Sequence, residues 1–208
     1  MGVNMRIPAE ALRQFPVGEG ERFTRCLRWG ALVALASLLC ACAHMPAPAG
    51  DAATVPLAGL AEPGEREVVV VINANSIAGS HAGMFAGGRL YDPSGTYTGK
   101  RSEDSAWVGP SLADYVKFHL RDGPDVRLFR FSLAEPEFAR IQARIAKAGW
   151  SLPLFCAEDV QAILAGIGPF LTLEANRWTS PAGLGLRLEA LTPTTLVRAD
   201  CDMPDQSC

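Results

Sequence analysis

Hydrophobic residues follow strand-like patterns in three parts of the chain. Residues 68–72 are an unbroken run of β-branched apolar side chains, which is typical of a strand buried on both faces. From His81 the sequence alternates as far as Gly87–Gly88, a two-residue turn signal, and a return segment then runs to Asp92. Residues 125–133 alternate apolar side chains with arginines and predict a half-exposed strand. We therefore expect a buried strand, a β-hairpin and a further strand.

Four other segments carry apolar residues at helical spacing. The first is capped by Ser111 and stops at Asp122–Gly123–Pro124. The other three are 135–149 with Gly149 as the C-terminal cap, about 157–164, and 180–191 with Ser180 as the N-terminal cap. Helices that follow a hairpin and a strand in this order predict an α+β domain with an antiparallel sheet.

The N-terminal region has a different pattern. Arginines between residues 22 and 28 precede an apolar run that is too short for a transmembrane helix, as in a secretory signal. The run ends in LCAC, which resembles the lipobox of bacterial lipoproteins and makes Cys42 the lipidated first residue of the mature chain. A signal without lipidation and a cytosolic chain with an apolar first helix are the alternatives. We expect a signal peptide over 1–41, a flexible tether over 42–65 rich in Ala, Pro and Gly, and one domain over 66–208.

Composition and charge narrow the class of partner. The 208 residues are 49% hydrophobic and 20% charged, as in an ordinary globular protein, and the net charge is −3. This charge balance gives no sign of a nucleic-acid partner. The lipobox resemblance implies a membrane partner through the anchor. Because Ala43 and not aspartate follows Cys42, it also implies the outer membrane of a Gram-negative host, with the domain facing the periplasm.

Cysteine usage singles out one thiol. Of six cysteines, two leave with the signal peptide and Cys42 carries lipid. Cys201 and Cys208 are close enough in sequence to form a disulfide in an oxidising compartment, which leaves Cys156 unassigned at the start of a predicted helix. The positive end of a helix favours a thiolate there. The alternatives for Cys156 are a disulfide with a tail cysteine and a buried inert thiol.

A nucleophilic cysteine needs an imidazole, and His81 is the best candidate in this chain. His44 lies in the tether, and His119 lies on the apolar side of a helix, where a structural role is more common. If the hairpin turns at Gly87–Gly88, paired residue numbers add up to about 175, which brings Asp92 near His81. Asp92 could then accept a bond from Nδ1–H of His81, although an aspartate before Pro-Ser-Gly is also typical of a turn. The aromatic side chains that could line a groove nearby are Tyr91, Tyr97 and Trp107.

Three motifs carry a resemblance to a known family. SHAGMF, GGRLYDPSG and the later FCAEDVQAIL resemble the circularly permuted papain-like fold of NlpC/P60-related and lecithin retinol acyltransferase-related proteins, over about residues 68–191. Phe155 and Ala157 stand where that family often has asparagine and serine. The resemblance implies a Cys156–His81–Asp92 hydrolase that cleaves an amide or ester through a thioester, with peptidoglycan peptides or lipids as substrates. It implies no cofactor and no metal. The alternative is an inactive lipoprotein that serves as a binding or assembly module.

Overall fold

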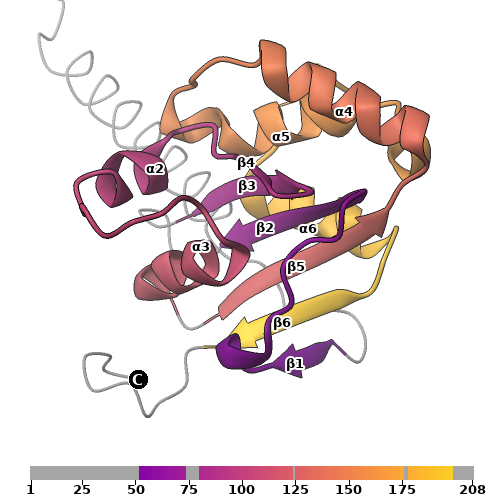
Figure 1. Cartoon of the computed structure of the whole chain (residues 1–208). Helices are drawn as coiled ribbons and strands as arrows, with labels where there is room; N and C mark the ends of the chain where they lie inside the picture. Colours follow the sequence, from indigo (N-terminus) through magenta and orange to yellow (C-terminus); the bar gives the residue numbers. More distant parts are fainter. Residues whose placement is uncertain (1–51, 74–79, 124, 176–177, 199–208) are drawn as a thin grey trace, which may run out of the picture. The chain divides into compact units, whose positions relative to one another are not determined.

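The computed structural model describes residues 52–73, 80–123, 125–175 and 178–198. Their strands form one six-stranded sheet in the order β1-β6-β5-β2-β3-β4 (Figure 1). The strands are β1 (Ala53–Val55), β2 (Glu67–Asn73), β3 (His81–Ala86), β4 (Arg89–Tyr91), β5 (Asp125–Ser132) and β6 (Thr194–Arg198). The helices are α2 (Thr96–Arg101), α3 (Leu112–His119), α4 (Glu135–Lys147), α5 (Cys156–Leu164) and α6 (Pro181–Glu189), with short 3-10 turns η2 (Leu57–Gly59), η3 (Leu120–Asp122), η4 (Pro153–Phe155) and η5 (Gly168–Phe170).

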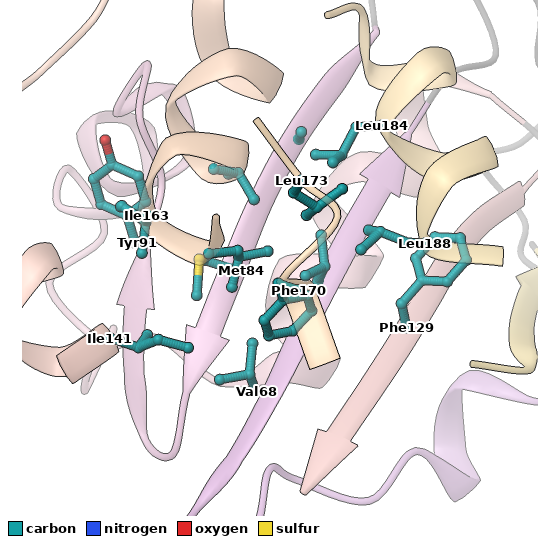
Figure 2. Packing of buried hydrophobic residues seen from close by; sticks show 14 of the residues in the cluster. Val68, Met84, Tyr91, Phe129, Ile141, Ile163, Phe170, Leu173, Leu184 and Leu188 are labelled. Carbon is teal, nitrogen blue, oxygen red and sulfur yellow. The ribbon is translucent and has the colours of Figure 1, made fainter. Parts of the chain in front are cut away.

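Strand β2 lies inside the sheet and is buried on both faces, as its apolar run predicts. Val68, Val70 and Ile72 point into a core covered by α4, α5 and α6. Val69 and Val71 point into a second core, which α2 and α3 cover. The alternation of side chains along a strand separates the two sets. Figure 2 shows the first core, where Val68, Met84 and Phe129 of the strands meet Ile141, Ile163 and Leu188 of the helices.

The predicted hairpin is confirmed together with its register. Met84 pairs with Tyr91 and Phe85 with Leu90, so paired numbers add up to 175. Gly87 occupies the turn with a φ of 57°, in the left-handed region that favours glycine. This register places the first residue of β3 and the residue after β4 at the same end of the sheet.

Two of the predicted helix caps are present. The Ser111 hydroxyl accepts from the backbone N–H of Asp114 at the start of α3. The Ser180 hydroxyl accepts from Gly183 N–H at the start of α6. These bonds satisfy donors that have no partner inside the helix. Helix α4 ends at Lys147 with Ala148 as its cap, so the prediction of Gly149 at that position is wrong.

The sheet is mixed, which corrects the expectation of an antiparallel sheet. The parallel contact joins β1 to β6, whereas the other strand pairs are antiparallel. Residues 53–65 also differ from the expected tether, since they contribute β1, a 3-10 turn and a capping side chain. Glu62 accepts from the backbone N–H of Leu112 at 2.8 Å. The α+β class is confirmed in its coarse form, with helices packed on both faces.

Strand β5 is more buried than its arginines suggest. Arg127 is 5% exposed, because its guanidinium donates to Glu189 of α6 at 2.8 Å. A buried charge with a charged hydrogen-bond partner avoids the cost of an unpaired ion. The expectation of a half-exposed strand is therefore wrong at this residue. In the described parts of the chain, no helix is both long and apolar enough to span a bilayer.

Candidate active site

The hairpin brings His81 and Asp92 together. His81 is the first residue of β3, and Asp92 directly follows β4. The Nε2–H of His81 donates to Oδ1 of Asp92 at 2.8 Å. The predicted proximity is confirmed, but the predicted nitrogen is wrong, since Nε2 and not Nδ1 makes the bond. Nδ1 thereby stays available for proton transfer on the other side of the ring.

Helix α2 holds the second oxygen of Asp92. Oδ2 accepts from the backbone N–H of Tyr97 at 3.1 Å, near the start of α2. The Asp92 side chain is only 2% exposed. Burial would raise the pKa of Asp92, but the bonds from His81 and from Tyr97 N–H, with the positive charge on His81, outweigh burial and lower it. Asp92 is therefore a fixed carboxylate at neutral pH.

Cys156 is the first residue of α5, the helix that packs against β3. It is 1% exposed and is not in a disulfide. Phe155 occupies the N-cap position, and no side-chain cap bond is formed there. The positive end of the helix dipole therefore lies at the residue that carries the sulfur. Cys156 is near enough to His81 to raise the pKa of the imidazole, so the strand and the helix contribute the two members of one polar pair.

The ionisation of His81 depends on both neighbours. Burial would lower the pKa of His81, but its electrostatic interactions with Asp92 and Cys156 raise it from 6.5 to about 9. The imidazole is thus positively charged at neutral pH. An imidazolium between a carboxylate and a thiol can give its proton to a leaving group and stabilise negative charge on sulfur.

Tyr115 of α3 is a part of this cluster that the sequence pattern does not single out, because its position fits an apolar helix face. Its hydroxyl oxygen lies 3.0 Å from Nε2 of His81. The same hydroxyl donates to Oδ1 of Asp92 at 3.5 Å. Gly83 makes room for it, because a Cβ at that position would lie 2.1 Å from the hydroxyl oxygen. The glycine in SHAGMF, two residues beyond His81 and so on the same strand face, is the sequence signal for this close approach.

His119 lies directly against His81. The two rings are stacked with centroids 4.8 Å apart and planes 13° apart. Burial first and then the charge on His81 lower the pKa of His119 to about 3, so it is neutral. Neither ring nitrogen of His119 has a hydrogen-bond partner within the described residues. The Asn73 side chain donates to the His119 backbone carbonyl at 3.0 Å, which ties the end of α3 to β2.

The predicted groove aromatics are divided between two places. Tyr97 and Trp107 pack edge to face, with ring centroids 5.9 Å apart, in the core under α2 and α3. Tyr91 instead lines a hollow of about 270 Å³ beside α5, together with Trp150 and Asp159.

The other predicted site residues lie outside the described residues. They are Cys42, with its expected lipid, and Cys201 and Cys208, with their expected disulfide. Among the described residues, no group of three or more His, Cys, Asp or Glu side chains is arranged to hold a metal ion.

Comparisons with known proteins give no family for this chain. No protein-family model, curated protein or solved structure matches it.

Proposed function

We propose that the protein is a cysteine hydrolase that cleaves an amide or ester bond through a thioester on Cys156. The observation that carries the proposal is the position of His81, which is bonded to Asp92 through Nε2 and interacts electrostatically with Cys156. A nucleophile, a base and a residue that orients the base are the parts that acyl transfer requires. The resemblance to permuted papain-like proteins predicts the same three residues.

The steps follow from the proton positions. The sulfur of Cys156 attacks the carbonyl carbon, and its proton resides on Nδ1 of His81. The backbone N–H groups at the start of α5 stabilise the oxyanion that forms. His81 then gives a proton to the leaving amine or alcohol as the C–N or C–O bond breaks. Water, deprotonated by His81, attacks the thioester and releases the acid and the free thiol.

Access to the sulfur is a further requirement. Cys156 is 1% exposed and His81 is 9% exposed, so a carbonyl group cannot reach the sulfur without movement of the residues that cover it. The hydrolase must therefore open this site when substrate binds. In the closed state, the residues that cover Cys156 protect its thiol from oxidation, which suits an enzyme in an oxidising compartment.

The proposed location is the cell envelope, with lipid on Cys42 and the domain facing the periplasm. The lipobox-like LCAC after an apolar run supports this location. Peptidoglycan stem peptides are then the most abundant amide substrate within reach, and we propose them as the first substrate class to test.

The nucleophile is tested with a thiol-alkylating probe on the full-length protein, with labelled sites mapped by peptide mass spectrometry. We expect measurable labelling of Cys156 at neutral pH, at a rate set by the opening of the site and by the reactivity of the thiol. His81→Ala should reduce the labelling rate at Cys156 by more than about tenfold, because the imidazolium is lost. Samples of both proteins unfolded in urea, where the Cys156 thiol is equally accessible, give the reference labelling rate. Equal labelling of Cys156 in both proteins would refute the proposed site.

The reaction is tested on purified peptidoglycan and on simple acyl esters, with released fragments identified by mass spectrometry. Cys156→Ser is the matched control, because it keeps the size of the side chain and removes the thiol. Product release that persists in Cys156→Ser contradicts the mechanism. A phenotype of a gene deletion that Cys156→Ser restores fully would instead favour the binding or assembly module.

A further inference from the structure

The segment between α4 and the candidate nucleophile exposes large apolar side chains. We call residues 150–155 the apolar segment. The exposed fractions are 74% for Trp150, 69% for Leu152, 79% for Leu154 and 39% for Phe155. No charged residue occurs from Ala148 to Ala157. Single exposed leucines are common, but a contiguous set of this kind marks an interaction surface.

Backbone contacts hold the apolar segment in this exposed arrangement. The backbone N–H of Ser151 donates to the Pro93 carbonyl at 2.9 Å. The backbone N–H of Phe155 donates to the Leu152 carbonyl at 2.9 Å within the η4 turn. The Trp150 ring occupies the space where a side chain at Gly95 would lie, and Gly95 has a φ of 64° that favours glycine. The fold thus presents these side chains outward on a supported loop.

The short chain between Cys42 and the domain limits how far the apolar segment can lie from a bilayer that holds the lipid. Because the sheet begins at Ala53 and not at residue 66, only nine residues, 43–51, separate Cys42 from the first described part at Ala52, which makes ten residue steps. Ten such steps span at most about 36 Å. Strand β1 and the β4 edge are five strand spacings apart, which is about 24 Å. A lipid on Cys42 therefore keeps both edges of the sheet within reach of the same bilayer.

We propose that the apolar segment docks on the surface of a phospholipid bilayer, with Trp150, Leu152 and Leu154 inserted at the level of the headgroups. The inference rests on the lipid anchor at Cys42 in the proposed function. Tryptophan favours the membrane interface, because its ring is apolar and its N–H remains hydrated. Exposed Lys147 precedes the segment and suits anionic headgroups.

Docking places the candidate nucleophile at the membrane surface. Phe155 directly precedes Cys156, and Ser151 is bonded to Pro93, which directly follows Asp92. The apolar segment is therefore next to the candidate site on two sides: through the chain at Cys156 and through the Ser151–Pro93 hydrogen bond at Asp92. The amide and ester groups closest to Cys156 are then those at or just above the bilayer.

The test uses the full chain purified with its lipid and reconstituted into vesicles of phosphatidylethanolamine and phosphatidylglycerol, with or without brominated acyl chains. Bromine quenches tryptophan fluorescence only at short range. We expect brominated vesicles to quench the wild-type emission and Trp150→Phe to remove most of that quenching. Trp178→Phe is the matched control, because Trp178 is also exposed, at 55%, but lies outside the apolar segment. Quenching that survives Trp150→Phe and disappears with Trp178→Phe overturns the proposal.

A second pair of variants tests the leucines without disturbing the fold. Leu152→Ser and Leu154→Ser should each lower the ratio of docked to undocked domain about tenfold, as read from quenching of Trp150. Leu171→Ser should leave it unchanged, since Leu171 is 75% exposed but follows Gly168, which lies against Glu137 at the other end of α4. Equal effects of the three substitutions overturn the proposal. Shielding of Trp150 that increases with protein concentration and does not need lipid also overturns it, because it indicates contact between protein chains.

Intact mass of the same preparation separates this proposal from the proposed function. A chain without lipid on Cys42 overturns the anchor and the docking together. A lipidated chain whose Trp150 is not quenched overturns the docking alone. Alkylation of Cys156 in detergent reports on the hydrolase site independently of both.

Discussion

The positive charge of His81 is held between a carboxylate and a neutral imidazole. Asp92 accepts from Nε2 on one edge of the ring, and His119 stacks against its face. Burial, and then repulsion by the charge on His81, lower the pKa of His119, whereas Asp92 and Cys156 raise that of His81. With Nε2–H bonded to Asp92, the proton that His81 can transfer is the one on Nδ1, and a general acid needs such a positioned proton.

The raised pKa of His81 predicts how stability depends on pH. Protonated His81 is favoured in the folded state, so its contribution is complete below its unfolded value of 6.5 and is lost as pH rises through about 9. We expect wild type to be more stable than His81→Gln at pH 6, with a gap that shrinks by pH 10. Urea unfolding of both proteins at several pH values measures this gap. A gap that is constant over that range would contradict the assignment.

Gly83 and Tyr115 should be energetically coupled. Gly83→Ala places a methyl group 2.1 Å from the Tyr115 hydroxyl oxygen and 2.9 Å from its Cζ, so the ring has to shift. We expect a loss of about 1–3 kcal/mol in the free energy of unfolding, as is typical of overpacking. Part of this cost should disappear in Tyr115→Phe, which lacks the oxygen. Unfolding of the two single variants, the double variant and wild type gives the coupling, and strictly additive losses would show that the contact does not exist.

Helix α5 carries Cys156 at one end and depends on α4 at the other. Nη1 of Arg144 donates to the carbonyls of Ala162, Ile163 and Ala165, at 3.2, 2.8 and 2.7 Å. These carbonyls lie at the C-terminus of the helix, where the chain has no further turn to satisfy them. One guanidinium thus fixes the far end of the element that presents the nucleophile.

Removal of this guanidinium should loosen α5. Arg144→Met leaves the carbonyls without their charged donor, and we expect a loss of about 2–3 kcal/mol in the free energy of unfolding. Arg144→Lys should lose less, because it keeps a positive charge near the same atoms. Arg140→Met is the control, since Arg140 is exposed on the same helix. Thermal unfolding compares the four proteins, and equal midpoints for the Arg144 and Arg140 variants would refute the capping role.

Prediction from the sequence succeeds where a local rule determines geometry. The Gly87–Gly88 turn fixes the hairpin register, and that register alone brings Asp92 to His81. The roles of Tyr115 and His119 were not predicted, because they are four residues apart and fit an ordinary apolar helix face.

Other features were not predicted from the sequence because they depend on residues far apart in the chain or on elements too short to show a pattern. Strands β1 and β6 have three and five residues, too few for a clear pattern, and their pairing joins opposite ends of the domain. The burial of Arg127 depends on Glu189, 62 residues away. Helix α2 has six residues and its role is to hold Asp92, which no periodicity indicates.

At the scale of the whole molecule, the residues before β2 complete the domain. Val55, Leu57 and Leu60 pack against the core under α3, and Glu62 accepts from the first backbone N–H of that helix. Strand β1 also covers the outer edge of β6. An uncovered edge strand pairs readily with other chains, so β1 also protects against association.

A chain that begins at residue 66, the boundary expected from sequence, should therefore be less stable than one that begins at residue 52. Loss of three partly buried apolar side chains and of the Glu62 cap should lower the free energy of unfolding by about 3 kcal/mol or more. Exposure of the β6 edge should also make the shorter chain associate. Glu62→Gln in the longer chain separates the effects, since it weakens only the cap at α3. Thermal unfolding and light scattering compare the three proteins. Equal midpoints and equal scattering for chains beginning at 52 and 66 would place residues 52–65 outside the folding unit, in which case the reach from Cys42 to the domain would be longer than the sheet implies.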